Sequence, residues 1–247
     1  MKGRHYFIIE WTLVLILMAL CVRIHQRDRT DKMTPTVNTG QQKICYLTFD
    51  DGPSKNTGKV LDILEEYDAK ATFFLIGNEV TEERRCDLER IKEQGHGIGL
   101  HSNVHTFERL YADPQTCLDD YLAEYETLKK EYDIDTKLFR FPGGSVCSYM
   151  NGQRDEFVKI MKDHGFRCFD WNVSGEDSVG NPTVWSIQNH VFQDVFRYNE
   201  PIILLHDSKI TDTTVDALPG ILERIREAGY VFHTLDEKEE YVFNWIR

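Results

Sequence analysis

The chain has 247 residues, of which 41% are hydrophobic and 28% are charged, a composition typical of a folded globular domain rather than a disordered segment. The formal net charge is -12 and is unevenly placed, because residues 1–44 carry seven Lys and Arg against three Asp and Glu, whereas the remainder is strongly acidic. An acidic body excludes nucleic acid as the expected partner, since binding to phosphates needs a basic surface.

The N-terminal segment begins with Lys2 and Arg4 and continues into an apolar run at residues 11–22, which residues 7–9 extend across Glu10. This stretch approaches the ~20 apolar residues that a helix needs to span a bilayer. We therefore predict a membrane anchor at residues 1–27. A cleaved signal peptide and a buried helix are the alternatives, although no clear small-x-small cleavage site follows the run. The polar residues 28–41 are predicted to be a linker that leads into one folded domain at residues 42–247.

The body alternates apolar runs of strand length with segments of helical periodicity. The runs predict strands at residues 43–49, 71–76, 97–100, 138–141, 167–173, 201–205 and 230–235. Helices are predicted near residues 57–64, 82–93, 118–128, 157–164, 184–196 and 218–225. About seven strands and about six helices in alternation indicate an α/β fold with parallel strands and crossover helices. Either a barrel or an open doubly wound sheet satisfies this pattern.

Polar side chains gather at the ends of these predicted strands. They are Asp50, Asp51, His101, Arg140, Asp177 and His206. In a β/α barrel the carboxyl ends of the strands meet on one face, which is where active sites lie. The sequence therefore predicts a single site built from all six residues.

Two short patterns within this set point to metal chemistry. Asp50 and Asp51 leave a strand as adjacent carboxylates, so that one could bind a metal while the other acts as a base, although Asp-Gly-Pro is also ordinary turn chemistry. His101 and His105 are four residues apart, which would place both imidazoles on one side of a helical turn, although two solvated loop histidines are the plain alternative. With Asp51 they form a set of two histidines and one carboxylate that suits zinc or another divalent ion.

His206 ends a buried strand, where a histidine is usually structural but could serve as a general acid.

These motifs resemble those of the NodB-type polysaccharide deacetylases, which form carbohydrate esterase family 4. Residues 48–53 (TFDDGP) and 101–105 (HSNVH) are similar to its first two motifs. Residues 140–144 (RFPGG), 170–177 (DWNVSGED) and 204–207 (LLHD) resemble the other three, in the same order along the chain. The resemblance implies an irregular (β/α) barrel of about seven strands, the NodB homology fold, following the predicted transmembrane helix.

The resemblance also implies a role for each site residue. Asp51, His101 and His105 would hold one divalent metal ion, with zinc expected first and cobalt, nickel or manganese as alternatives. Asp50 would be the general base and Arg140 its orienting partner. The backbone N–H of Gly143 would stabilise the oxyanion, and Leu204 would form a wall of the acetyl pocket. His206 would be the general acid, kept charged by Asp177.

One position departs from the family pattern, because Ser178 stands where relatives often carry a tryptophan that shapes the acetyl pocket. Trp171 is the residue that could replace it.

The function implied is metal-dependent hydrolysis of N-acetyl groups on a polysaccharide, with N-acetylglucosamine residues of peptidoglycan as the expected substrate. The alternatives are chitooligosaccharides, O-acetyl esters of xylan-like glycans, and a carbohydrate-binding relative without catalysis. A cell-wall substrate places the domain outside the cell membrane on a single-pass anchor, or secreted after signal cleavage.

Overall fold

The computed structural model describes residues 42–243. The predicted anchor at residues 1–27 and the predicted linker at residues 28–41 both lie outside this range. None of the helices within residues 42–243 combines the length and the apolar character that crossing a bilayer requires.

Parallel strands form one sheet in the order β5-β4-β3-β2-β1-β7-β6, and β8 pairs with the first residues of β1. The strands are β1 (Lys43–Gly52), β2 (Ala71–Leu75), β3 (Gly97–Leu100), β4 (Leu138–Phe139), β5 (Arg167–Cys168), β6 (Val173–Ser174), β7 (Ile202–His206) and β8 (Tyr230–Phe232). The central strand β1 is a nearly continuous apolar run because both of its faces are covered, as parallel sheets require. The predicted α/β architecture with parallel strands is confirmed.

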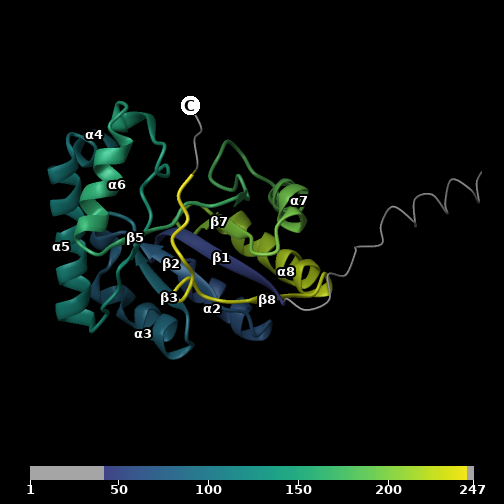
Figure 1. Cartoon of the computed structure of the whole chain (residues 1–247). Helices are drawn as coiled ribbons and strands as arrows, with labels where there is room; N and C mark the ends of the chain where they lie inside the picture. The colour runs from purple at the N-terminus through teal and green to yellow at the C-terminus, as the bar shows by residue number, and fades with distance from the viewer. Residues whose placement is uncertain (1–41, 244–247) are drawn as a thin grey trace, which may run out of the picture. The chain divides into compact units, whose positions relative to one another are not determined.

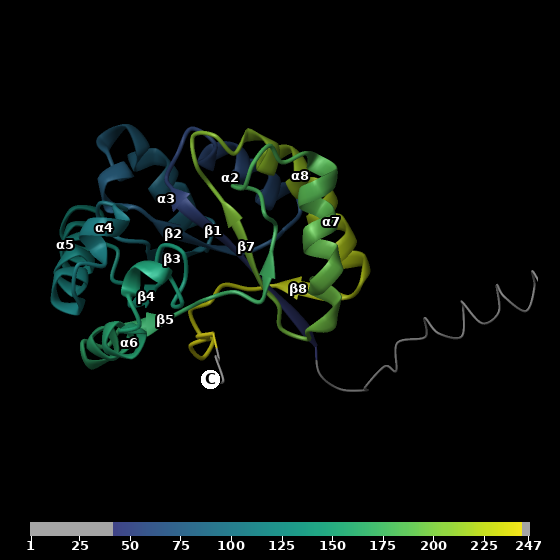
Figure 2. The ribbon, with the colours of Figure 1, turned by 90° about the horizontal axis from the view of Figure 1, so that it is seen from above.

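Helices cover the outside of this sheet, as Figure 1 and the view from above in Figure 2 show. They are α2 (Thr57–Glu66), α3 (Arg85–Glu93), α4 (Phe107–Leu110), α5 (Pro114–Tyr132), α6 (Arg154–Asp163), α7 (Val184–Asp194) and α8 (Asp212–Glu227). The start of α5 follows from its sequence, because Asp113 caps the amide of Thr116 and Pro114 occupies the first turn. Neighbouring helices contact one another in the pairs α3–α2, α2–α8, α8–α7 and α5–α6. The outer layer thus supports both halves of the sheet.

The strand predicted at residues 167–173 is wrong as a single element. Its ends become β5 and β6, which pair with β4 and β7 on opposite edges of the sheet. Between them Asp170 accepts hydrogen bonds from the backbone N–H groups of Ser145 (2.8 Å) and Phe243 (2.7 Å), so the chain leaves the strand direction there. Within the described residues no ladder joins β5 to β6. The sheet therefore agrees with the expected (β/α) barrel in an incomplete, open form.

Candidate active site

The two adjacent aspartates face different ways because β1 is irregular at its end. The register of β1 against β2 shifts between Asp50 and Gly52, and Asp51 has a left-handed backbone with φ of 72°. Asp50 is 3% exposed, while Asp51 is partly open to solvent. The irregularity gives the two carboxylates separate surroundings, as predicted from the sequence.

His101 and His105 do converge, but not through a helical turn. Residues 101–105 form an irregular loop after β3, in which Ser102 and His105 have φ angles of 74° and 50°. The His101 and His105 ring centroids are 5.2 Å apart. The loop replaces the helix that the four-residue spacing suggested, because left-handed residues cannot propagate an α-helix.

Asp51, His101 and His105 offer three donor atoms that lie within 4.8 Å of one another. Asp51 Oδ1 is 3.5 Å from His101 Nε2 and 3.2 Å from His105 Nε2. Two ligands about 2.0–2.1 Å from a tetrahedral ion stand ~3.3 Å apart, so these spacings suit a shared divalent ion. The residues present therefore fit the metal that the family motif implies.

The surroundings of His101 and Asp51 agree with that use. The Nδ1 atom of His101 is 3.0 Å from the carbonyl oxygen of Arg140, an arrangement that leaves Nε2 free for a metal. Burial lowers the pKa of His101 and keeps the ring neutral, despite the charges of Asp50 and Asp51. Burial would also raise the pKa of Asp51, but the hydrogen bond from His105 and the nearby imidazoles outweigh it and hold that pKa well below its ordinary value. A neutral imidazole and an ionised carboxylate are the forms that bind metals.

Arg140 lies fully buried beneath Asp50 and fixes it in place. Its Nη1 atom donates to Asp50 Oδ1 at 2.8 Å and to Thr48 Oγ1 at 2.7 Å, and its Nε donates to the carbonyl of Phe169 at 2.7 Å. A guanidinium with several fixed acceptors cannot turn away from the carboxylate. Asp50 Oδ2 is 3.7 Å from His101 Nε2, so the oriented carboxylate borders the metal-binding set.

His206 ends β7 on the other side of β1 from His101. Its Nδ1 donates to Asp177 Oδ1 at 2.8 Å, while Asp177 Oδ2 accepts from the His206 backbone N–H at 2.8 Å and from Thr214 Oγ1 at 2.7 Å. Burial lowers the pKa of His206, but Asp177, Asp50 and Asp51 outweigh it and raise the pKa to about 9. The ring is therefore an imidazolium at neutral pH, with Nε2–H facing the pocket.

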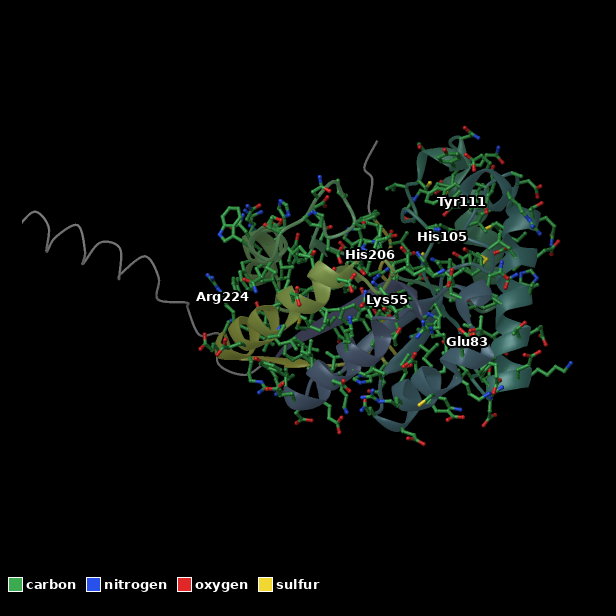
Figure 3. The ribbon with its side chains drawn as sticks, turned by 180° about the vertical axis from the view of Figure 1, so that it is seen from behind. Lys55, Glu83, His105, Tyr111, His206 and Arg224 are labelled. Carbon is green, nitrogen blue, oxygen red and sulfur yellow. The ribbon has the colours of Figure 1, made fainter. Side chains whose placement is uncertain are left out.

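A cavity of about 360 Å³ brings these groups together. Its lining includes seven of the nine predicted site residues, namely Asp50, Asp51, His101, His105, Gly143, Leu204 and His206. The other two, Arg140 and Asp177, lie behind Asp50 and His206 and act through them. Figure 3 shows His105 and His206 at the same end of the sheet. The sequence motifs thus meet in one site.

Several lining residues were missed from the sequence. They are Phe107, Ser174, Glu176 and Val179. Phe107 packs edge-on against His105 with ring centroids 5.6 Å apart, and it follows the histidine motif closely enough that its position could have been noticed. Trp171, considered as a replacement for the family tryptophan, does line the pocket, and Ser178 Oγ lies 3.5 Å from His206 Nε2.

Comparisons with known proteins agree with this geometry. Residues 37–169 match the family model described as polysaccharide deacetylase. A peptidoglycan-N-acetylglucosamine deacetylase of Bacillus cereus is 33% identical over 213 residues, which are 84% of this chain and 75% of that protein. A bifunctional xylanase/deacetylase of Pseudobutyrivibrio xylanivorans is 36% identical over 81% of this chain and 31% of its own length. The catalytic domain of a peptidoglycan N-acetylglucosamine deacetylase from Eubacterium rectale superposes with a TM-score of 0.76 at 30% identity, covering 87% of this chain and 98% of that one. The chain belongs to the polysaccharide deacetylase family.

Proposed function

We propose that the chain is a metal-dependent hydrolase that removes acetyl groups from N-acetylglucosamine residues of peptidoglycan. One observation carries the proposal. A carboxylate fixed by a buried arginine and a charged histidine fixed by a buried aspartate line the same cavity, beside a set of three metal donors. Amide hydrolysis needs a base for the water and an acid for the departing amine, and this pair supplies both.

Asp51, His101 and His105 would hold the divalent ion, and zinc suits the donor set, as do cobalt, nickel and manganese. When bound, such an ion polarises the acetyl carbonyl and lowers the pKa of water. Asp50 takes the proton of the attacking water. Arg140 supports this step because its guanidinium holds the carboxylate in place beside the metal set.

The departing sugar nitrogen must gain a proton as the amide bond breaks. Nε2–H of His206 faces the cavity and can donate it, while Asp177 stabilises the charged ring until then. The backbone N–H of Gly143 donates a hydrogen bond to the developing oxyanion. Gly143 adopts a φ of 75°, a backbone conformation that favours glycine, and Leu204 forms part of the cavity wall.

Two observations bear on the glycan. Relatives described as acting on peptidoglycan match this chain over most of its length, which favours N-acetylglucosamine in a cell-wall polymer. The xylanase/deacetylase relative favours a second candidate, the O-acetyl ester of a xylan-like glycan, which the same acid, base and metal set could hydrolyse. A cell-wall substrate also requires the domain to lie outside the cell membrane, and we propose that residues 1–27 anchor it there.

The experiment compares acetate release from three substrates at equal acetyl content. They are purified peptidoglycan, chitooligosaccharides and O-acetylated xylan, each incubated with the zinc-loaded chain. We expect the highest kcat/KM on peptidoglycan. A higher kcat/KM on O-acetylated xylan would transfer the assignment to the ester, and preference for the free oligomers would assign chitooligosaccharides instead.

A further inference from the structure

The loop at residues 101–105 carries two of the three metal donors, yet it has no regular secondary structure. One side of the loop is held by the turn after β2, because Gly77 N–H donates to Ser102 O at 3.1 Å and Asn78 N–H donates to Asn103 O at 2.9 Å. A side chain at residue 77 would not fit, since a Cβ there would lie 2.3 Å from Asn103 Oδ1. The carbonyl groups of Ser102 and Asn103 therefore have fixed partners.

The amide groups of the same loop face two carboxyl groups of α5. Asp120 Oδ2 accepts from Asn103 N–H at 2.6 Å and also faces the N–H of Val104. Glu124 Oε1 lies 3.4 Å from His101 N, whose shorter bond runs to Leu75 O at 2.7 Å, and it also faces the N–H of Ser102. Residues four apart project from one side of a helix, so the two carboxyl groups face the amides of residues 101–104.

Glu124 is unusual because its carboxyl group is completely buried. Its side chain is 0% exposed, and its Oε2 has no hydrogen-bond partner in the described part of the chain. A buried carboxyl group with an unmatched oxygen destabilises a fold, so its presence behind the metal loop needs a reason that packing alone does not supply. The interaction with the loop amides provides one.

We propose that Asp120 and Glu124 are positioning residues, which hold the main chain of residues 101–105 so that His101 and His105 face Asp51 before any metal binds. The left-handed residues Ser102 and His105 are the reason such holding is needed, because an unsupported loop would relax toward commoner backbone conformations. Partners of this kind orient the ligands of metal sites without touching the ion. The inference rests on the metal site of the proposed function.

Asp120 offers the sharper test, because it is only half-buried and a matched control stands beside it. Asp119 is the exposed neighbouring residue of α5, bonded to Gln115 at 2.8 Å, and its removal changes the charge equally. Asp120→Ala, Asp120→Asn and Asp119→Ala would be made in the full chain. Two quantities are measured, the zinc Kd by competition with a chelator and amide hydrogen exchange at residues 101–105 in the metal-free protein.

Asp120→Ala is expected to weaken zinc binding at least ~10-fold and to speed exchange of the Asn103 and Val104 amides by a similar factor. Asp120→Asn keeps an acceptor oxygen, so it and Asp119→Ala should stay within about threefold of the wild type. Glu124→Leu and Glu124→Gln form a second pair of variants. Glu124→Leu is expected to weaken zinc binding and to speed amide exchange at His101 and Ser102 by similar factors. Glu124→Gln keeps an acceptor oxygen and is expected to stay near the wild type.

Two results would overturn the positioning role. One is unchanged amide exchange or unchanged zinc Kd in Asp120→Ala. The other is an equal loss in Asp120→Asn, because charge rather than the hydrogen bond would then explain the effect. A wild-type chain that binds no zinc would instead contradict the proposed function, and the exchange measurement, made without metal, would still decide the positioning role.

Discussion

Asp177→Asn tests how the general acid is kept charged. The pKa of His206 rises from 6.5 to about 9 although burial opposes this, and Asp177 contributes most to the rise. The rise corresponds to ~3 kcal/mol in favour of the imidazolium. An asparagine cannot accept both from Nδ1–H and from the His206 backbone N–H, since one of its two terminal atoms is a donor. We therefore expect the pKa of His206 to return toward its ordinary value.

The size of the effect follows from the protonated fraction. At pH 7.5 an imidazole of pKa about 9 is ~97% protonated, and one near 6.5 is ~9% protonated, so kcat should fall about tenfold at pH 7.5 and recover toward pH 6. Because His206 acts as an acid, kcat falls as pH rises through the pKa of His206. The alkaline limb of the kcat profile should thus move from about 9 toward ~6.5 in the variant.

The assay is acetate release across pH 5.5–10 at saturating substrate and metal. Asp216→Asn removes an equal charge from an exposed position on α8 and should leave the alkaline limb in place. Thermal unfolding of both variants separates a loss of folding from a shift in the pKa. An alkaline limb that stays near 9 in Asp177→Asn would refute the assignment of His206 and Asp177 as a coupled acid.

Asp50→Asn should lower kcat by ~10²-fold or more with little change in zinc Kd, and an activity within tenfold of the wild type would show that Asp50 is not the base. Arg140→Met leaves Asp50 buried without its partner and should destabilise the fold by ~3–5 kcal/mol in denaturant unfolding. Unchanged stability would contradict the importance of that ion pair. His105→Gln removes a metal donor and should raise the zinc Kd beyond the ~10–100-fold that losing an outer partner costs. An unchanged Kd would remove His105 from the ligand set.

The parallel α/β fold and the convergence of the site were predictable because both depend on local patterns. Apolar runs of strand length bounded by turn residues predicted the strands, and six of the nine site residues were predicted from their places at strand ends. His105 was predicted from its spacing to His101, and Gly143 and Leu204 were predicted only from the family resemblance. The outcome at residues 167–173 was not predictable, because it depends on Asp170 accepting backbone amides from Ser145 and Phe243, which are remote in the sequence.

The conformation of the loop at residues 101–105 was not predictable from its local sequence either. A spacing of four residues predicts proximity through a helix, whereas His101 and His105 meet through two left-handed backbone conformations. Those conformations are held by α5 and by the turn at Gly77, and neither contact leaves a local signal in residues 101–105. Pocket residues such as Val179 were missed for a related reason, since their sequence looks like an ordinary loop.

Acetate release from purified peptidoglycan by the full chain is the most direct measurement of the proposed activity. The chain would be compared as zinc-loaded, as chelator-treated, as chelator-treated and then zinc-restored, and as zinc-loaded Asp50→Asn. We expect acetate release by the zinc-loaded and zinc-restored chains, and at least ~10²-fold less from the chelator-treated chain and from Asp50→Asn. Release that survives chelation and the Asp50 substitution, or no release from a zinc-loaded and folded chain, would contradict it.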